Sequence, residues 1–145
     1  MTPQALQTFL HQHIPASSAL AIQVQTCDDQ QIIMTAPHHL NRNHKNTVFG
    51  GSIALAATLC AWSMVHIRCP QTQGNIVIQD SQIRYLRPAL HDLKLCTLAG
   101  EEAAWQDMFT QLEQTGKGKI ILTTELFSQD KLVAVFKGKF VALKT

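Results

Sequence analysis

Residues 43–52 carry the side chains and backbone groups most suited to chemistry in this chain. The segment reads Asn-His-Lys-Asn-Thr-Val-Phe-Gly-Gly-Ser and leads into an apolar stretch, residues 48–65, that contains no charged side chain. Glycines at a helix start let another molecule approach the backbone, because no Cβ atom blocks it. The first N–H groups of a helix lack internal partners and lie at the positive end of its dipole. Gly50 and Gly51 could therefore hold negative charge developing on a carbonyl oxygen, with the Asn43 amide as a second donor.

The same residues also have a purely structural interpretation. A Gly-Gly pair before a buried helix can serve only close packing, and Asn43 can serve only to organise its loop. His44 is either an acid or base near neutral pH or a solvated loop histidine. The Thr58 hydroxyl either holds a water or substrate oxygen or bonds to its own helix backbone.

A metal site and a thiol nucleophile are both disfavoured. His38 and His39 precede His44, but adjacent histidines point apart and no cysteine or carboxylate completes a ligand set. We therefore expect no metal and no other cofactor. Cys60 lies inside the apolar stretch, where a thiol usually behaves as a small apolar side chain. The other cysteines are widely spaced and no signal peptide begins the chain, which favours reduced thiols in a cytoplasmic protein.

The composition fits one soluble domain, residues 1–145, with no nucleic acid as a partner. A chain of 145 residues is too short for two ordinary domains. Apolar residues make up 46% of it and charged residues 15%, which leaves enough apolar surface for a sizeable core or a buried subunit interface. The net charge of +2 comes with no basic run, so the electrostatic footprint of a nucleic-acid-binding protein is missing.

The apolar stretch raises the question of a membrane span. It falls just short of the roughly 20 residues that a spanning helix needs. It also contains Gly-Gly-Ser near its start and two further polar residues, Thr58 and Ser63. We predict a helix buried in the protein core and no contact with a membrane.

The rest of the chain predicts a sheet around that helix. Hydrophobic spacing indicates an amphipathic helix over 3–13, a hairpin of strands over 20–26 and 31–35, and a polar loop over 36–47. After the central helix, 48–66, we expect strands over 75–86, 93–100, 119–128 and 131–142 and a second helix over 101–114. A sheet that wraps the central helix would bury it on all sides, which explains its lack of a polar face. The predicted fold class is α+β.

This order of elements, with a Gly-Gly helix start, resembles the hotdog fold of thioesterases and acyl-ACP dehydratases, in which an antiparallel sheet wraps one long central helix. Two motifs narrow the resemblance: residues 43–52 and Ile-Arg-Tyr-Leu-Arg-Pro at 83–88. Both are similar to the putative thioesterase family found as the C-terminal domain of certain bacterial acetyltransferase-like proteins. The resemblance covers nearly the whole chain. It implies an enzyme that acts on thioesters of coenzyme A (acyl-CoA) or of acyl carrier protein (acyl-ACP).

One departure from the fold's better-known members bears on mechanism. Hotdog thioesterases of the phenylacetyl-CoA type commonly show Asn-x-x-Gly-Thr-x-His-Gly-Gly, with an acidic residue further along the helix as base or nucleophile. On that pattern Asn43 polarises the thioester carbonyl, Gly50 and Gly51 form the oxyanion hole, and Phe49 replaces the histidine. The acidic position falls at Thr58, and no Asp or Glu occurs from residue 30 to residue 79.

The missing carboxylate leaves three functions open. Hydrolysis needs a group that activates water, worth about 10²–10⁴ in rate, and His44 or Asp80, from either subunit, could supply it. Relatives include malonyl-ACP decarboxylases, which supply acetyl-ACP for fatty-acid biosynthesis. Decarboxylation needs no base, only donors for an enolate oxygen and an apolar wall, here Phe49 and Ile53. We predict a thioester hydrolase, with a malonyl-ACP decarboxylase and a non-catalytic acyl-thioester binding module as alternatives.

The resemblance also implies where the substrate lies. The residues expected to touch it are Phe49, Gly50, Ser52, Ile53, Thr58, Arg84, Tyr85 and Arg87. The phosphates of CoA could be held by Arg84 and Arg87, or by lysines of the last two strands. Asp80 either pairs with Arg84, or with an arginine of a second subunit, or acts as the missing base.

Assembly follows from the same fold. Hotdog proteins pair an exposed strand edge with its copy across a two-fold axis and place active sites between subunits. The high apolar content and low charge of this chain suit a large buried contact. We predict a homodimer, or a dimer of dimers, in which each site combines residues 43–51 of one chain with residues 80–85 of the other.

Overall fold

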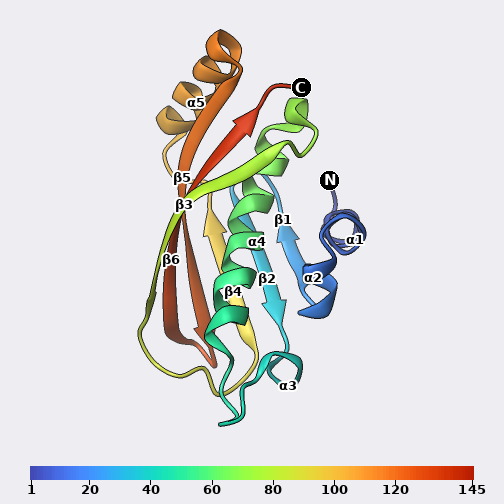
Figure 1. Cartoon of the computed structure of the whole chain (residues 1–145), viewed down its shortest axis with the longest axis vertical. Coiled ribbons are helices and arrows are strands. Elements are labelled where there is room, and N and C mark those ends of the chain that lie inside the picture. Colours follow the sequence, from blue (N-terminus) through green and yellow to red (C-terminus); the bar gives the residue numbers. More distant parts are fainter.

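One antiparallel sheet of six strands frames the protein in this computed structural model, which describes residues 1–145 (Figure 1). The strands lie in the order β1-β2-β4-β5-β6-β3. Their bounds are β1 Gln23–Cys27, β2 Gln31–Ala36, β3 Ile76–Tyr85, β4 Leu93–Leu98, β5 Lys117–Ser128 and β6 Lys131–Leu143. All neighbouring pairs are antiparallel, and the predicted α+β class is confirmed.

The long helix α4 (Gly50–Arg68) lies along one face of this sheet and forms the centre of the core (Figure 1). It packs against β2, β3, β4, β5 and β6. Small side chains such as Ala56, Ala57 and Ala61 are fully buried, so the strands approach the helix closely. By length and composition α4 could cross a membrane, yet half of its most apolar 18 residues are buried inside the protein. The prediction of a buried core helix is confirmed.

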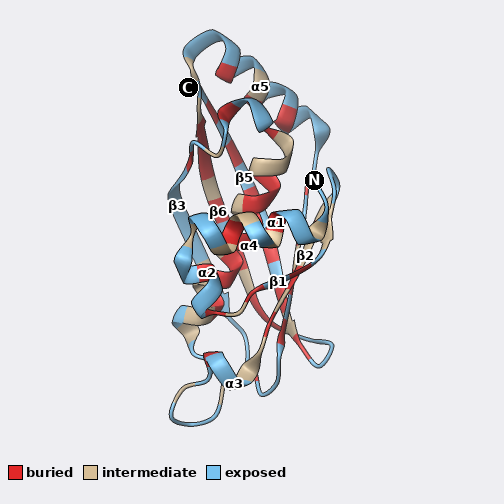
Figure 2. Cartoon of the chain, turned by 90° about the vertical axis from the view of Figure 1, so that its right-hand side faces the viewer, coloured by how far each residue is buried: buried red, intermediate tan, exposed pale blue.

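Strand alternation gives the sheet an inner face against α4 and an outer face toward solvent. On β6, Phe136 and Phe140 are buried against the core, whereas Lys137 between them is exposed. Figure 2 shows the buried residues gathered along the strands beside α4. This period of two matches the alternation read from the sequence.

The helices at the rim differ more from the prediction. Helices α1 (Pro3–His13) and α5 (Glu102–Thr115) were expected, and α5 packs on β5. Three short turns were not expected: α2 (Pro15–Ala19), α3 (His38–Asn41) and η1 (Pro70–Thr72). Each spans about one turn, too few residues for a helical repeat to show in the sequence.

The beginning of β1 was also predicted too early. The strand starts at Gln23 and not at residue 20. The reason is local, because Ala21 has a left-handed backbone with φ of 55°, which an extended strand does not allow.

Strand β3 forms one edge of the sheet. It pairs with β6 on one side and has no partner on the other. Two of its apolar side chains remain open to solvent, Val77 at 50% and Ile78 at 39% of full exposure. An edge of ten residues with apolar side chains is a surface that proteins usually cover.

The contact between α5 and β5 depends on Gly118. A Cβ atom at this position would lie 2.6 Å from the Met108 carbonyl oxygen and 3.0 Å from Met108 Cγ. We predict that Gly118→Ala lowers the free energy of unfolding by about 1–3 kcal/mol, because α5 must move off the sheet. A thermal unfolding curve should show a melting temperature lower by about 3–10 °C.

Gly50→Ala is the matched control for this change. Its added Cβ atom would meet only the Tyr85 ring, at an ordinary 3.5 Å. Its melting temperature should equal that of the natural protein, and an equal loss in both variants would contradict the packing explanation.

Candidate active site

The loop before α4 is closed by the side chain of Asn43. Its amide oxygen accepts hydrogen bonds from the backbone N–H groups of Lys45 (2.9 Å) and Thr47 (3.2 Å). Its amide nitrogen donates to the Thr47 hydroxyl at 2.9 Å. Asn46 adopts a left-handed φ of 66°, which reverses the chain inside this loop. Asn43 therefore organises the loop, and the second hydrogen of its NH₂ group has no partner in the chain.

Backbone hydrogen bonds anchor this loop to the body of the protein. The Val48 N–H donates to the Ala89 carbonyl at 2.9 Å, and the Phe49 N–H donates to the Asn41 carbonyl at 2.8 Å. Asn41 is itself buried, and its side-chain amide donates to two backbone carbonyls at 3.0 and 2.8 Å. The loop is thus fixed at both ends, which positions the start of α4.

Helix α4 begins without a capping side chain. Phe49 occupies the N-cap position in an extended conformation, and the first helical bond runs from the Ile53 N–H to the Phe49 carbonyl at 3.1 Å. The N–H groups of Gly50, Gly51 and Ser52 therefore have no partner in the chain. No acidic residue lies in this first turn to use up the positive end of the helix dipole.

The two glycines serve different purposes. A Cβ atom on Gly51 would lie 2.5 Å from the Phe49 ring, which covers this position and is itself 57% exposed. Gly50 faces the Tyr85 ring at ordinary contact distance, and the Tyr85 hydroxyl donates to the Gly50 carbonyl at 3.2 Å. Neither glycine has a positive φ. Gly51 is required because the Phe49 ring leaves no room for a Cβ atom, whereas the space at Gly50 would accept one.

A cavity of about 420 Å³ opens beside this helix start. We call it the thioester hollow. More than half of its lining residues are apolar, and none is an acid or a histidine. It is lined by Thr47, Val48, Gly50, Ile53, Tyr85, Leu86, Arg87, Pro88 and Ala89.

The structure brings four of the predicted site residues together here: Gly50, Ile53, Tyr85 and Arg87. Five lining residues were not predicted. Thr47 and Val48 come from the loop, and Leu86, Pro88 and Ala89 follow the end of β3. Leu86 and Pro88 belong to the 83–88 motif that carried the family resemblance, but of residues 86–89 only Arg87 was predicted to touch the substrate.

Other predicted residues lie around the hollow without lining it. Asn43 is half-buried and donates a hydrogen bond to Thr47, which lines the hollow. His44 is exposed and makes no hydrogen bond. Ser52 offers its free backbone N–H in the first turn of α4. The Thr58 hydroxyl donates to the Ala54 carbonyl at 2.8 Å, so it bonds to its own helix.

Asp80 and Arg84 point away from the thioester hollow of their own chain. A bulge between Ile78 and Asp80 places Asp80 opposite Lys139 and Arg84 opposite Val135, on the outer face of the sheet. The expected Asp80–Arg84 ion pair does not form, since the two ion pairs of the chain lie elsewhere. Any role of Asp80 in the reaction would have to come from a second chain.

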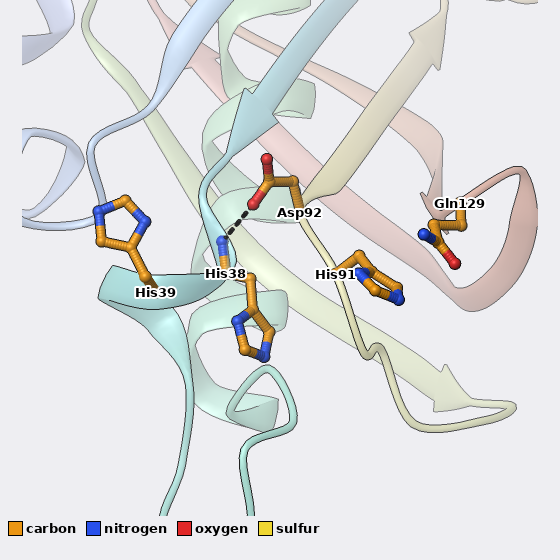
Figure 3. Close-up of a pocket in the computed structure, with 5 residues that line it drawn as sticks. All are labelled: His38, His39, His91, Asp92 and Gln129. Carbon is orange, nitrogen blue, oxygen red and sulfur yellow. Dashed lines mark hydrogen bonds between the residues drawn. The ribbon is translucent and has the colours of Figure 1, made fainter.

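A larger cavity, of about 480 Å³, lies among α3, the segment before β4 and the turn between β5 and β6 (Figure 3). It is lined by His38, His39, His91, Asp92 and Gln129, with no apolar side chain among them. The His38 backbone N–H donates to Asp92 at 2.7 Å, and the His39 ring turns away from the other side chains (Figure 3). No group of three metal-binding side chains forms here or elsewhere. A polar cavity of this kind is poorly suited to an acyl chain.

The Cys60 thiol is unsuited to nucleophilic chemistry. It is fully buried in α4 and its sulfur lies 3.6 Å from the Ile32 carbonyl. Burial raises the pKa of Cys60 to about 12, because the thiolate would lose its hydration. The thiol therefore stays protonated at physiological pH.

Comparison with known proteins connects this geometry to a family. The family described as "Putative thioesterase (yiiD_Cterm)" matches residues 3–144. A putative thioesterase from Shewanella oneidensis is similar in structure, with 31% identity, a TM-score of 0.83, and coverage of 97% of this chain and 96% of that one. A protein of unknown function from Chlorobaculum tepidum TLS has 26% identity and a TM-score of 0.90, over 99% of this chain and 98% of the other.

A more distant structure shows the fold alone. The PaaI protein of the E. coli phenylacetic acid degradation operon is 16% identical, with a TM-score of 0.70 over 97% of this chain and 93% of that one. Together these matches confirm the hotdog fold that the sequence predicted.

The burial of Cys60 leads to a prediction about thiol chemistry. At pH 8, four units below a pKa of about 12, roughly one thiol in ten thousand is ionised. We predict that Cys60→Ala leaves the number of thiols that react with a disulfide reagent in the folded protein unchanged. After unfolding the variant should show one thiol fewer than the natural protein. Cys27→Ala, at a half-buried position, is the comparison and should lose a reactive thiol in both states. A lower native count in Cys60→Ala would mean that the thiol is accessible.

Proposed function

The chain belongs to the putative thioesterase family yiiD_Cterm, and on that premise we propose that it hydrolyses acyl thioesters at the start of α4. One observation carries the proposal. The N–H groups of Gly50, Gly51 and Ser52 are free of partners and open beside an apolar hollow. Such groups are fixed before the substrate arrives, so no reorganisation is needed when charge develops.

In this proposal the thioester carbonyl oxygen lies on the first turn of α4. The acyl chain then enters the thioester hollow, where Val48, Ile53 and Leu86 provide apolar contacts. Attack by water forms a C–O bond and turns the carbonyl oxygen into an oxyanion, which the free N–H groups and the helix dipole stabilise. The C–S bond breaks when the oxyanion collapses, and the leaving sulfur takes up a proton.

Asn43 supplies a second donor to the same oxygen. Its side chain is held at three points by the loop, so one N–H can be directed at the substrate without a loss of side-chain entropy on binding. The side chain that organises the loop is thus available for catalysis too.

The group that activates water has to come from outside the hollow. His44, next to Asn43, is exposed and free of hydrogen bonds, which leaves it able to accept a proton from a water at the rim. A residue of a second chain, with Asp80 as a candidate, is the other source.

One feature of the hollow favours a second candidate, decarboxylation of a malonyl thioester. The lining contains no acid and no histidine, so the carboxylate of the substrate would meet no fixed base, and Arg87 is the one charged side chain beside it. Loss of CO₂ moves the bonding electrons onto the thioester carbonyl as an enolate, and the same N–H groups would stabilise its oxygen. The enolate then takes a proton to give the acetyl thioester.

Product analysis separates these reactions. The protein is incubated with malonyl-ACP and with a series of acyl-CoA substrates, and the products are followed by free-thiol titration and mass spectrometry. Release of thiol supports hydrolysis, whereas acetyl-ACP without thiol identifies the decarboxylase. If neither product forms, the function that remains is a non-catalytic acyl-thioester binding module.

We predict that Asn43→Asp lowers kcat/KM by about 10²–10³-fold, because it removes the donor to the oxyanion. The aspartate keeps an oxygen for the N–H groups of Lys45 and Thr47, so the loop retains its fold. Steady-state kinetics and thermal unfolding measure the two effects separately.

Thr47→Val is the control for the loop itself. It deletes the hydroxyl that accepts from Asn43 but leaves the amide donor in place. Its activity should stay within a few-fold of the natural protein. If Asn43→Asp were equally active, the amide would only organise the loop.

We also propose that the protein is a homodimer joined at β3. This edge strand is ten residues long, lacks a partner, and carries Val77 and Ile78 in solvent. Pairing with a second copy would satisfy its free backbone groups and cover both side chains. It would also bring Asp80 of one chain toward the helix start of the other. Tyr85, which was expected to come from the second chain, instead contacts Gly50 of its own chain.

We predict that the protein sediments as a particle of about twice the 16.1 kDa chain mass, because β3 pairs with β3 of a second chain. Ile78→Lys should give monomers, because a charge at this edge opposes pairing. Leu40→Lys, at an exposed leucine away from the edge, is the matched control and should stay dimeric. A natural protein that is active as a monomer would contradict both the dimer and a shared site.

A further inference from the structure

The tip of the Asn43 loop is tied to the body of the protein by a single side chain. The Nε2 atom of the His38 ring lies 2.7 Å from the Asn46 carbonyl oxygen. No other side chain from outside residues 43–47 bonds to this turn, whose remaining hydrogen bonds run within it. A carbonyl oxygen can only accept a hydrogen bond, so Nε2 carries the proton and donates it.

His38 and Asn43 bond to opposite ends of the same peptide group. This group joins Asn46 to Thr47. Its carbonyl accepts from His38 at 2.7 Å, and its N–H donates to the Asn43 amide oxygen at 3.2 Å. Because a peptide group is planar, fixing the direction of its carbonyl also fixes the direction of its N–H. The His38 ring therefore acts on the Asn43 side chain through one rigid unit.

The peptide group needs this support because it follows a strained residue. Asn46 has a left-handed φ of 66°, a conformation that costs energy in any residue other than glycine. Rotation of the peptide plane would turn the Thr47 N–H away from Asn43. The amide oxygen of Asn43 would then keep only its bond from the Lys45 N–H.

The residue that supplies the ring is itself held in place. The His38 backbone N–H donates to the Asp92 carboxylate at 2.7 Å, which ties the start of α3 to the segment before β4 (Figure 3). At the other end of α3, Asn41 is buried and its amide donates to the carbonyls of Leu20 and Pro37. The ring thus projects from a helical turn that is fixed at both ends.

We propose that His38 is a positioning residue, which holds the Asn43 side chain in place through the Asn46–Thr47 peptide group. The inference rests on the proposed function, in which Asn43 donates to the thioester oxygen. Misplacement of a catalytic group by about 1 Å can cost up to about 10²-fold in rate. Loss of the ring should therefore appear in kcat, because the donor is needed most where charge develops in the transition state.

The kinetic test uses variants that differ in one N–H group. His38→Phe keeps a ring of similar size without the donor and should lower kcat about tenfold, with KM within about twofold of the natural value. His38→Gln supplies an amide N–H in place of Nε2 and should restore most of the rate. His39→Phe is the matched control, since His39 is the next residue and is exposed, with a ring that turns away (Figure 3). It should keep the natural kcat.

A double-mutant cycle separates positioning from a merely structural role. In Asn43→Asp the donor that His38 positions is already missing. Adding His38→Phe to that variant should lower kcat/KM less than about twofold further. Two losses that multiply would mean that His38 acts independently of Asn43, and this result would overturn the inference.

Hydrogen exchange measured by NMR distinguishes failure of this inference from failure of the proposed function, because it needs no turnover. The Thr47 N–H should exchange about tenfold faster in His38→Phe, since its bond to Asn43 opens more often, and at the natural rate in His39→Phe. If the protein turns over no thioester, faster exchange still supports the hold of His38 on Asn43. Unchanged exchange in His38→Phe overturns the inference whether or not the protein is active, and so does a natural kcat in that variant.

Discussion

The structure depends on burying one helix that has no polar face. Helix α4 buries apolar side chains by packing on the sheet, and five of the six strands contact it, while Ala54, Leu55, Thr58 and Trp62 stay half-buried on its other side. The small residues Ala56, Ala57 and Ala61 let the strands come close along its length. Because the sheet covers the middle of the helix, the exposed part is its first turn. Burial of α4 thus determines where its free N–H groups meet solvent.

A second constraint acts at that first turn, where the loop and the end of β3 converge. Val48 bonds to Ala89, and Tyr85 bonds to Gly50, so three segments distant in sequence are held around one hollow. The Phe49 ring lies over Gly51, where any side chain would collide with it. These contacts keep the helix start uncapped, and an uncapped helix start is what a developing oxyanion requires.

Sequence periodicity was enough to predict most of the long elements, because α4 and strands β2, β4, β5 and β6 each bury a repeating pattern of apolar residues. It failed where the pattern breaks. Ile76 and Ile78 lie opposite the buried residues Ala142 and Phe140 of β6, and simple alternation would place Asp80 on the same face of the sheet. The bulge between Ile78 and Asp80 shifts the strand by one residue and turns Asp80 outward. A bulge of this kind leaves no periodic signal in one sequence.

The sequence likewise predicted one part of the candidate site and missed another. Motif resemblance located the loop and helix start, and Gly50, Ile53, Tyr85 and Arg87 do meet in one hollow. Leu86, Pro88 and Ala89 were not predicted to line it, because their positions depend on the packing of an irregular segment against Val48 and Val133. The motif resemblance favoured a catalytic role for Asn43, with loop organisation as the alternative. The hydrogen bonds show that Asn43 organises the loop, and they leave one N–H of its amide without a partner.

The central claim is that a substrate carbonyl lies on the free N–H groups at the start of α4. Isotope-edited infrared spectroscopy tests it directly, with a bound substrate analogue in which CH₂ replaces the thioester sulfur and the carbonyl carbon is ¹³C. Strong hydrogen bonds from Gly50, Gly51 and Asn43 would shift the carbonyl stretch to lower frequency than in water, and the shift should shrink in Asn43→Asp. A bound analogue whose carbonyl absorbs as it does in water would contradict the claim.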